Sequence, residues 1–212
     1  MSFAIRSLAK ILLVCMMFTM LIVPAYATET ADNTVRGEIV LHEKAKADKE
    51  LFNKVPTYSQ NDYPNTPYGN GTIKSSGCGI TSLAMVASYL LNDEILPDEL
   101  AEEFGSRRDS NVGRMLYAAD TLGLTYTKTF EFNDVKTALE EGKVAIVLLN
   151  ETSKLTNSQH LVVYSGITSE GLIIIKDPNS HNWTRYEKEF TNGFKQSSAS
   201  NGFSGAWIFD NP

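Results

Sequence analysis

The sequence predicts an α+β domain in which helices come first and an antiparallel sheet follows. Between residues 78 and 142, apolar residues recur at helical spacing, whereas from residue 144 onward they form short runs rich in β-branched residues. The chain has 212 residues, and the 42% that are hydrophobic are enough to bury one sizeable core. Helices and strands that are segregated along the chain are typical of α+β folds, because α/β folds alternate the two.

Residues 1–27 have the features of a secretory signal peptide. Arg6 and Lys10 precede an apolar run over residues 11–23, and the segment ends in Ala-Tyr-Ala. This run has 13 residues, whereas a membrane-spanning helix needs roughly 20. We therefore expect cleavage after Ala27 and secretion to the cell exterior or cell surface. An uncleaved membrane anchor is the alternative.

The chain that remains after this cleavage is acidic. From Thr28 onward it has 17 basic and 25 acidic residues, a net charge of −8. Nucleic acids and anionic lipids bind mainly clustered lysine and arginine, so we expect neither a nucleic acid nor a membrane span after cleavage. Residues 28–54 are highly charged and have no aromatic residue before Phe52, which predicts a linker, a short helix or a propeptide-like segment. The folded domain is expected to be a monomer and to span residues 55–212.

The elements expected in this domain follow from its periodicity and its turn-forming residues. Residues 56–76 are rich in Pro, Gly, Asn and Asp, which predicts a long loop. Four helices are expected next: one with the apolar face Leu83, Val86, Ala87 and Leu90, one over 97–105, one over 111–122, and one that Asn133 or Asp134 caps and Gly142 ends. Strands are expected over 144–149, over 161–167 and 172–176 with a hairpin at 168–171, and further extended segments at 183–190 and 206–209.

Cys78 is the candidate nucleophile of the mature chain. The sequence has two cysteines, and Cys15 lies in the signal peptide, so Cys78 cannot form an internal disulfide. It lies between Gly77 and Gly79 before a predicted helix, and glycine permits a tight turn and the close approach of a substrate. The free N–H groups and the dipole at a helix N-terminus stabilise a thiolate, which is the nucleophilic form. A buried, inert cysteine is the alternative interpretation.

A cysteine nucleophile needs a base, and the base needs an orienting partner. His160 begins a predicted strand, whereas His181 lies in a turn and is interpreted as a solvated loop residue. Asp177 ends the next strand of the predicted hairpin, and neighbouring strands bring the start of one near the end of the other. Asp before Pro is also common in turns, so Asn179 is a second candidate for the orienting residue.

The developing oxyanion of an acyl transfer needs hydrogen-bond donors. The side-chain amide of Gln60, in the loop before the nucleophile, and the backbone N–H of Cys78 are the candidates. A zinc site is not expected from one cysteine and scattered histidines, and residues 177–181 lack the glycine and glutamate that should follow in a calcium loop. The expected chemistry uses neither a metal nor another cofactor.

Four segments together resemble the C39-like cysteine peptidases, which are papain-fold domains related to those that cleave double-glycine leader peptides. These segments are 55–60, 76–86, 160–163 and 176–178, in this order within about residues 55–210. The resemblance implies a papain-like fold with Cys78 as nucleophile, His160 as base, Asp177 as orienting residue and Gln60 in the oxyanion hole. Gln159 stands where glycine is frequent in the family, which is expected to narrow the cleft.

The expected function is that of a secreted cysteine peptidase that hydrolyses amide bonds of a peptide or protein substrate. Two alternatives keep the fold and change its use. One is a catalytically weak or inactive binding module at the cell surface, and the other is an amidase that acts on cell-wall peptides. The reactivity of Cys78 distinguishes the first alternative from an enzyme, and release of fragments from purified wall material identifies the second.

Overall fold

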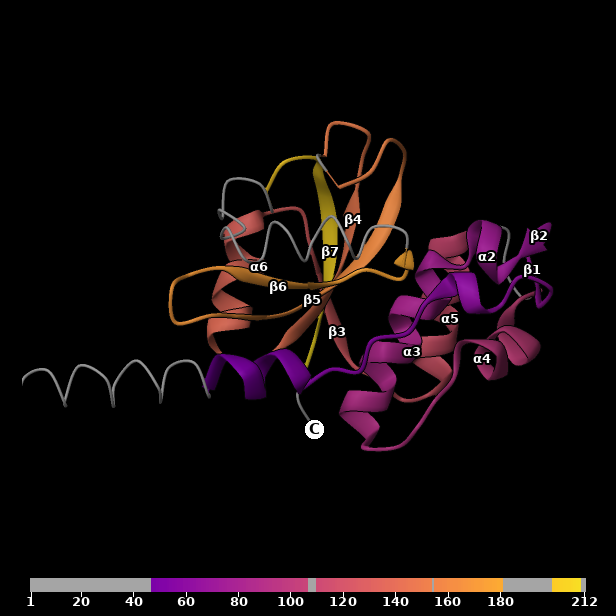
Figure 1. The fold of residues 1–212 in the computed structure, drawn as a ribbon, viewed down its shortest axis with the longest axis horizontal. Coiled ribbons are helices and arrows are strands. Elements are labelled where there is room, and N and C mark those ends of the chain that lie inside the picture. Colours follow the sequence, from indigo (N-terminus) through magenta and orange to yellow (C-terminus); the bar gives the residue numbers. More distant parts are fainter. Residues whose placement is uncertain (1–46, 107–109, 154, 181–199, 211–212) are drawn as a thin grey trace, which may run out of the picture. The chain divides into compact units, whose positions relative to one another are not determined.

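The computed structural model describes residues 47–106, 110–153, 155–180 and 200–210, all within a unit of residues 42–212. It confirms the predicted α+β architecture, because a group of helices precedes most of an antiparallel sheet (Figure 1). The extended segment expected at 183–190 lies outside the described residues. No helix in the described ranges is both long enough and apolar enough to cross a membrane.

The segment expected as a loop over residues 56–76 contains short regular elements. They are the 3-10 helix η1 (Gln60–Asp62), the paired strands β1 (Pro67–Tyr68) and β2 (Gly71–Thr72), and the helix α2 (Ile73–Ser76). Gly69 makes the hairpin turn at a φ of 59°, which glycine adopts at little cost. The loop prediction is wrong here because Tyr68 and Ile73 are buried, and their packing orders a segment whose composition alone indicates turns.

Three longer helices form where the periodicity predicts them: α3 (Cys78–Leu91), α4 (Pro97–Phe104) and α5 (Asn111–Thr121). Pro97 occupies the first turn of α4, where its missing N–H is not needed. At the start of α5 the Ser110 hydroxyl accepts a hydrogen bond from Gly113 N. The predicted apolar face of α3 is buried, and so is almost every other residue of this helix, because it packs on the sheet as well as on α4 and α5.

The sheet has five strands in the order β3-β7-β4-β5-β6, and each neighbouring pair is antiparallel. They are β3 (Tyr126–Thr129), β4 (Val144–Leu149), β5 (His160–Ile167), β6 (Ile173–Lys176) and β7 (Phe203–Phe209). The predicted hairpin between β5 and β6 is confirmed. Thr168 N donates to Leu172 O at 2.8 Å, and Gly171 takes a φ of 80° in the turn.

The edge strand β3 is absent from the elements that the sequence predicts. Its two central residues, Thr127 and Lys128, are exposed and polar, so the segment shows no hydrophobic pattern of a strand. It is a strand because its backbone pairs with β7 over four residues. This pairing joins segments that are about eighty residues apart and leaves no local signal in the sequence.

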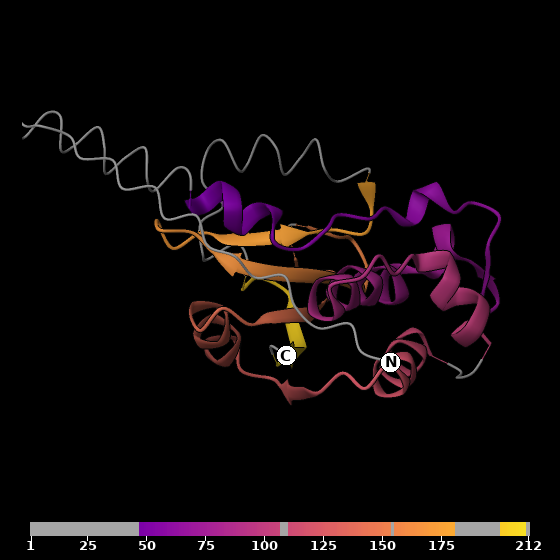
Figure 2. The same cartoon turned by 90° about the horizontal axis from the view of Figure 1, so that it is seen from below.

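Helices cover both faces of the sheet. On β4, Val144 and Ile146 belong to a core with α3, α4 and α5, whereas Ala145 and Val147 belong to a second core with α6 (Phe132–Glu140). This alternation follows from the two-residue period of a strand. The sheet is therefore the middle layer of the described structure, as Figures 1 and 2 show. Burial on both faces explains why the sequence of β4 is continuously apolar.

The helix α6 begins before the predicted cap. The sequence predicts a cap at Asn133 or Asp134, but the residue that precedes the helix is Glu131. The Asp134 carboxylate instead accepts a hydrogen bond from Thr129 Oγ1 at 2.6 Å, and that hydroxyl accepts one from Glu131 N at 3.0 Å. Asp134 therefore lies within the first turn of the helix, where the negative charge of a carboxylate interacts favourably with the helix dipole. The residues predicted to face inward are buried: Val135, Ala138 and Leu139.

Residues 47–53 are helical and pack against the hairpin of β5 and β6. The Leu51 side chain fills the space beside Gly166. The Lys176 Nζ lies 3.7 Å from the centroid of the Phe52 ring. The composition assigns these residues to the charged segment before the domain, and in the structure they contact the sheet. None of them lines the pocket described below.

Candidate active site

Cys78 is the first residue of α3, and it is half-buried at the helix N-terminus that the sequence predicts for it. Gly77 has a φ of −88°, which other residues also adopt, but a Cβ there would lie 2.5 Å from a carbonyl oxygen of α2. A Cβ on Gly79 would lie 2.6 Å from Asn111 Oδ1 and 3.0 Å from Leu161 Cδ1. The two glycines therefore let α2, α5 and β5 pack closely around Cys78. This packing role adds to the tight turn and substrate approach that the sequence indicates, which stay predictions.

His160 and Asp177 lie together at the end of the β5–β6 hairpin. His160 is the first residue of β5, and Asp177 directly follows β6. The antiparallel pairing brings the two ends together, and His160 Nε2 lies 2.7 Å from Asp177 Oδ1. The same oxygen accepts a hydrogen bond from Asn179 N at 2.7 Å. Asp177 therefore contacts the ring and also forms the turn that the Asp-Pro sequence indicates.

The thiol and the imidazole change each other's affinity for protons. Burial raises the pKa of the Cys78 thiol, but hydrogen bonding and Coulomb attraction from His160 outweigh it, so the pKa lies below its ordinary value. Burial lowers the pKa of His160, but hydrogen bonds with Asp177 and Cys78 outweigh it and raise this pKa to about 10. Both shifts favour a thiolate beside an imidazolium over a neutral thiol beside a neutral imidazole.

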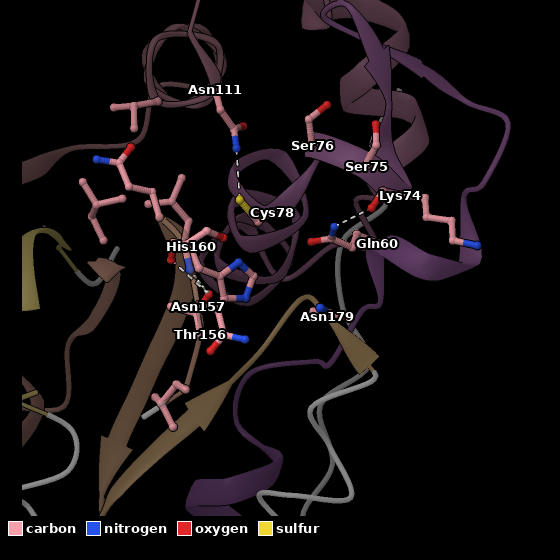
Figure 3. Close-up of a pocket in the computed structure, with 16 residues that line it drawn as sticks. Gln60, Lys74, Ser75, Ser76, Cys78, Asn111, Thr156, Asn157, His160 and Asn179 are labelled. Atoms are coloured by element: carbon pink, nitrogen blue, oxygen red, sulfur yellow. Dashed lines mark hydrogen bonds between the residues drawn. The ribbon is translucent and has the colours of Figure 1, made fainter. Parts of the chain in front are cut away.

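Two further donors face the sulfur. A backbone hydrogen bond from Leu161 lowers the pKa of Cys78, and Asn111 Nδ2 donates to Cys78 Sγ at 3.0 Å (Figure 3). Asn111 is absent from the sequence-based candidates. The sequence offers little signal for it, because it lies 33 residues from Cys78 and asparagine is common at helix starts. Only the packing of α5 on α3 brings it to the sulfur.

Gln60 lines the same pocket as Cys78 and His160. Its Nε2 donates to Lys74 O at 2.7 Å, which links η1 to α2 and fixes the orientation of the amide. Its Oε1 is buried and has no hydrogen-bond partner among the described residues. Figure 3 shows Gln60 and Asn111 on different sides of Cys78, one from η1 and the other from α5.

The pocket around these residues has a volume of about 600 Å³. One wall comes from α2 and α5, and the facing wall comes from residues 155–161, which include Gln159. Its lining side chains are mostly uncharged and polar, and Lys74 is the charged one besides the Cys78–His160 pair. The volume falls within the roughly 300–1,000 Å³ that is typical of ligand pockets.

The remaining candidates from the sequence have different positions. Asn179 lines the pocket, and its Oδ1 accepts a hydrogen bond from Asn61 Nδ2 at 2.8 Å, so it packs η1 against the turn after β6. Asp177 is the residue whose side chain lies at hydrogen-bond distance from the ring of His160. His181 lies outside the described residues. Among the residues that the structure describes, no group of three or more His, Cys, Asp or Glu is arranged to hold a metal ion.

Comparisons with known proteins give one family match and distant structural likenesses. The model of the Peptidase_C39 like family matches residues 52–207. One similar solved structure is a Bacillus anthracis protein described as a C39-like peptidase. It is 18% identical, has a TM-score of 0.48, and the match covers 76% of this chain and 96% of that chain. Another is the peptidase domain of Streptococcus ComA, a bifunctional ABC transporter involved in a quorum sensing pathway, with 18% identity, a TM-score of 0.42, and coverage of 65% and 93%. No curated protein sequence matches the chain.

Proposed function

Because the chain belongs to the Peptidase_C39 like family, we propose that it is a cysteine peptidase with Cys78 as nucleophile, His160 as acid and base, and Asp177 as the orienting residue. The observation that carries this proposal is the 2.7 Å contact between His160 and Asp177 beside a cysteine at a helix N-terminus. A nucleophile, a base in contact with it and a third group that orients the base are the parts that covalent acyl transfer requires.

The reaction begins when the Cys78 thiolate attacks the carbonyl carbon of the substrate. A C–S bond forms, and the carbonyl π electrons move to the oxygen. When this tetrahedral intermediate collapses, the C–N bond breaks and His160 gives its proton to the leaving amine. Water then attacks the thioester and gives a proton to His160, and the C–S bond breaks to release the acid. The cycle consumes one water per peptide bond and regenerates the thiolate–imidazolium pair.

Gln60 is proposed to stabilise the oxyanion. Its Nε2 carries two hydrogens, and the bond to Lys74 O uses one of them, which leaves the other for a substrate oxygen in the pocket. The backbone N–H of Cys78, at the start of α3, is the second proposed donor. The bond to Lys74 O supports this role because it holds the amide rigidly before the charge develops.

The proposed site of action is outside the cell. The basic, apolar and Ala-Tyr-Ala segments of residues 1–27 support secretion with cleavage after Ala27. A low-pKa thiolate outside the cell is prone to oxidation, so activity is expected to require a reductant. The substrate is proposed to be a peptide or protein, and the polar pocket favours small or uncharged side chains near the cleaved bond.

The test is the pH dependence of iodoacetamide labelling of Cys78 in the reduced protein, together with hydrolysis of a mixed peptide library. We expect rapid labelling near pH 6, where an ordinary thiol labels slowly, and loss of this low-pH labelling in His160→Ala. Lys136→Ala, on α6 and outside the pocket lining, is the control, and it should label like the wild type.

The outcomes separate the proposed enzyme from its alternatives. An ordinary thiol midpoint above about pH 8 in the wild type contradicts the enzyme and favours a binding module. Low-pH labelling together with cleavage confined to purified wall peptides identifies a cell-wall amidase. Low-pH labelling with cleavage of library peptides supports the peptidase.

A further inference from the structure

A line of hydrogen bonds leads from the helix α5 to the sulfur of Cys78. Asn111 Nδ2 donates to Cys78 Sγ at 3.0 Å, and the Tyr68 hydroxyl donates to Asn111 Oδ1 at 2.9 Å. Arg114 hydrogen bonds to the Tyr68 side chain, and its guanidinium carbon lies 4.9 Å from the centroid of the Tyr68 ring. Asn111 and Arg114 belong to α5 and Tyr68 belongs to β1, and Figure 3 shows Asn111 on the other side of the sulfur from His160.

The direction of these bonds is fixed by chemistry. An arginine can only donate, so the Tyr68 oxygen accepts from Arg114 and its own hydrogen goes to Asn111 Oδ1. With Oδ1 occupied in this way, the NH₂ group of Asn111 must face the sulfur. Tyr68 is 1% exposed, and burial raises its pKa far above the ordinary value. The phenol therefore keeps its proton, and the donor to Asn111 persists over the working pH range.

Asn111 is a poor candidate for the oxyanion hole. Its amide already contacts Sγ in the resting site, whereas an oxyanion donor must face the oxygen that becomes charged during attack. Gln60 approaches from η1 on another side of Cys78 and has the hydrogen that such a role needs (Figure 3). Asn111 therefore donates to the sulfur itself, which carries the negative charge before the reaction when it is a thiolate, and not to the oxygen that becomes charged during it.

We propose that Asn111 is a further catalytic residue, which donates a hydrogen bond to the Cys78 thiolate, and that Tyr68 and Arg114 are positioning residues that hold its amide toward the sulfur. This inference rests on the proposed function. A hydrogen bond to a charged group is stronger than one between neutral groups, so Asn111 increases the population of thiolate at neutral pH. It also reduces the intrinsic nucleophilicity of that thiolate, because a more stable thiolate reacts more slowly.

Other charged and titratable groups also act on Cys78, and the test must separate them from Asn111. His160 on β5 is the principal one, and it is paired with Asp177 after β6. Among the described residues, Lys74 on α2 is the other charged side chain that lines the pocket. Tyr68 on β1 and Arg114 on α5 act on the sulfur through Asn111. Substituting Asn111 leaves every one of these charges in place.

The experiment measures iodoacetamide labelling of the full reduced chain from pH 4 to pH 11, with the Cys78 peptide quantified by mass spectrometry so that Cys15 does not interfere. For Asn111→Ala we expect the midpoint to rise by about one pH unit. We also expect the limiting rate at high pH to rise about two- to threefold, since a thiolate of higher pKa is more nucleophilic. Asn111→Asp places an acceptor at the same position and should raise the midpoint further, and Tyr68→Phe should raise it less.

Ser110→Ala is the control, because it removes the cap of the same helix without touching Cys78. It should leave the midpoint unchanged. The inference is overturned if neither Asn111→Ala nor Asn111→Asp moves the midpoint, or if Ser110→Ala moves it by the same amount. It is also overturned if the limiting rate of Asn111→Ala falls, because that is the result expected from a loosened site. A low midpoint in a wild type that hydrolyses no peptide contradicts the proposed function, and the labelling series still decides the role of Asn111.

Discussion

The carboxylate of Asp177 performs two tasks with a single oxygen. Oδ1 lies 2.7 Å from His160 Nε2 and also accepts the backbone N–H of Asn179 at 2.7 Å. The second bond fixes the side-chain rotamer, and the first bond then fixes the ring of His160. With Nε2 engaged, Nδ1 is the nitrogen left to face Cys78. The charge of Asp177 also contributes to the raised pKa of His160.

Asp177→Asn is expected to keep the turn and lose the charge. The amide oxygen still accepts from Asn179 N, but the imidazolium loses its carboxylate, so the pKa of His160 falls from about 10 toward its ordinary value. In the wild type, kcat/KM is expected to fall at high pH, where the imidazolium loses its proton. A lower pKa of His160 should move this alkaline fall of kcat/KM to lower pH in the variant. We expect the maximal kcat/KM to fall at least about tenfold.

A pH profile of kcat/KM for wild type and Asp177→Asn checks this expectation. Circular dichroism of the variant provides the control for folding. An alkaline limb that stays near pH 10 in the variant would show that another group holds the proton on His160.

At the scale of elements, the site depends on how closely α3 approaches α5 and β5. Ser82, on the buried surface of α3, donates to Leu161 O at 3.3 Å, one residue after His160. Gly79 leaves room for Asn111 on one side and Leu161 on the other. Contacts along this junction set the separation between the cysteine at the start of α3 and the histidine at the start of β5.

Gly79→Ala is expected to disrupt this junction, because its methyl group would lie 2.6 Å from Asn111 Oδ1 and 3.0 Å from Leu161 Cδ1. Overpacking of this kind typically costs about 1–3 kcal/mol in the free energy of unfolding. The displaced Asn111 should also raise the labelling midpoint of Cys78. Urea unfolding measures the loss of stability, and iodoacetamide labelling measures the change at Cys78. Gly123→Ala is a comparison variant: a Cβ there meets no atom within 4 Å, so this variant shows the effect of a strained positive φ without a steric clash.

At the scale of the whole described structure, the sheet is covered by α3, α4 and α5 on one face and by α6 on the other. The proposed nucleophile comes from the helical layer, and the proposed base and its orienting residue come from the ends of two sheet strands. The hairpin of β5 and β6 that carries the base is covered in turn by residues 47–53. Lys176, the last residue of β6, lies under Phe52 and is 3% exposed.

Lys176→Met tests the energetic consequence of this packing. Burial lowers the pKa of Lys176 from its ordinary 10.5 to about 8. The folded chain therefore binds this proton more weakly than the unfolded chain, so the contribution of Lys176 to stability is greatest above pH 10.5 and is lost as the pH falls to 8. The variant should lack this slope and be more stable at pH 7 by about 1–2 kcal/mol, after the loss of the contact with Phe52.

The measurement is urea unfolding at several pH values between 7 and 10.5. Lys136→Met, on α6, where Lys136 pairs with Glu140 at 3.2 Å, is the matched control for the removal of a lysine charge. Equal slopes for the wild type and Lys176→Met would mean that Lys176 is solvated when folded.

Local patterns in the sequence predict most of the elements and the residues of the proposed catalytic group. Val144–Leu149, the hairpin turn at 168–171 and the helices over 97–104 and 111–121 follow from periodicity and turn chemistry, which act over a few residues. Cys78, His160 and Asp177 can be selected because each lies at an element end that the sequence marks. Their roles as nucleophile, base and orienting residue stay predictions that the labelling experiments test.

The tertiary structure determined the features that depend on contacts between distant segments. The strand β3 exists because it pairs with β7, the helix over 47–53 is held by the β5–β6 hairpin, and Asn111 reaches Cys78 because α5 packs on α3. The sequence by itself determined the α+β class, the cysteine at a helix start and the histidine at a strand start, because short-range backbone preferences and hydrophobic spacing suffice for these. Polar residues such as Thr127 and Asn111 carry no such local pattern, so only the packed structure shows what they contact.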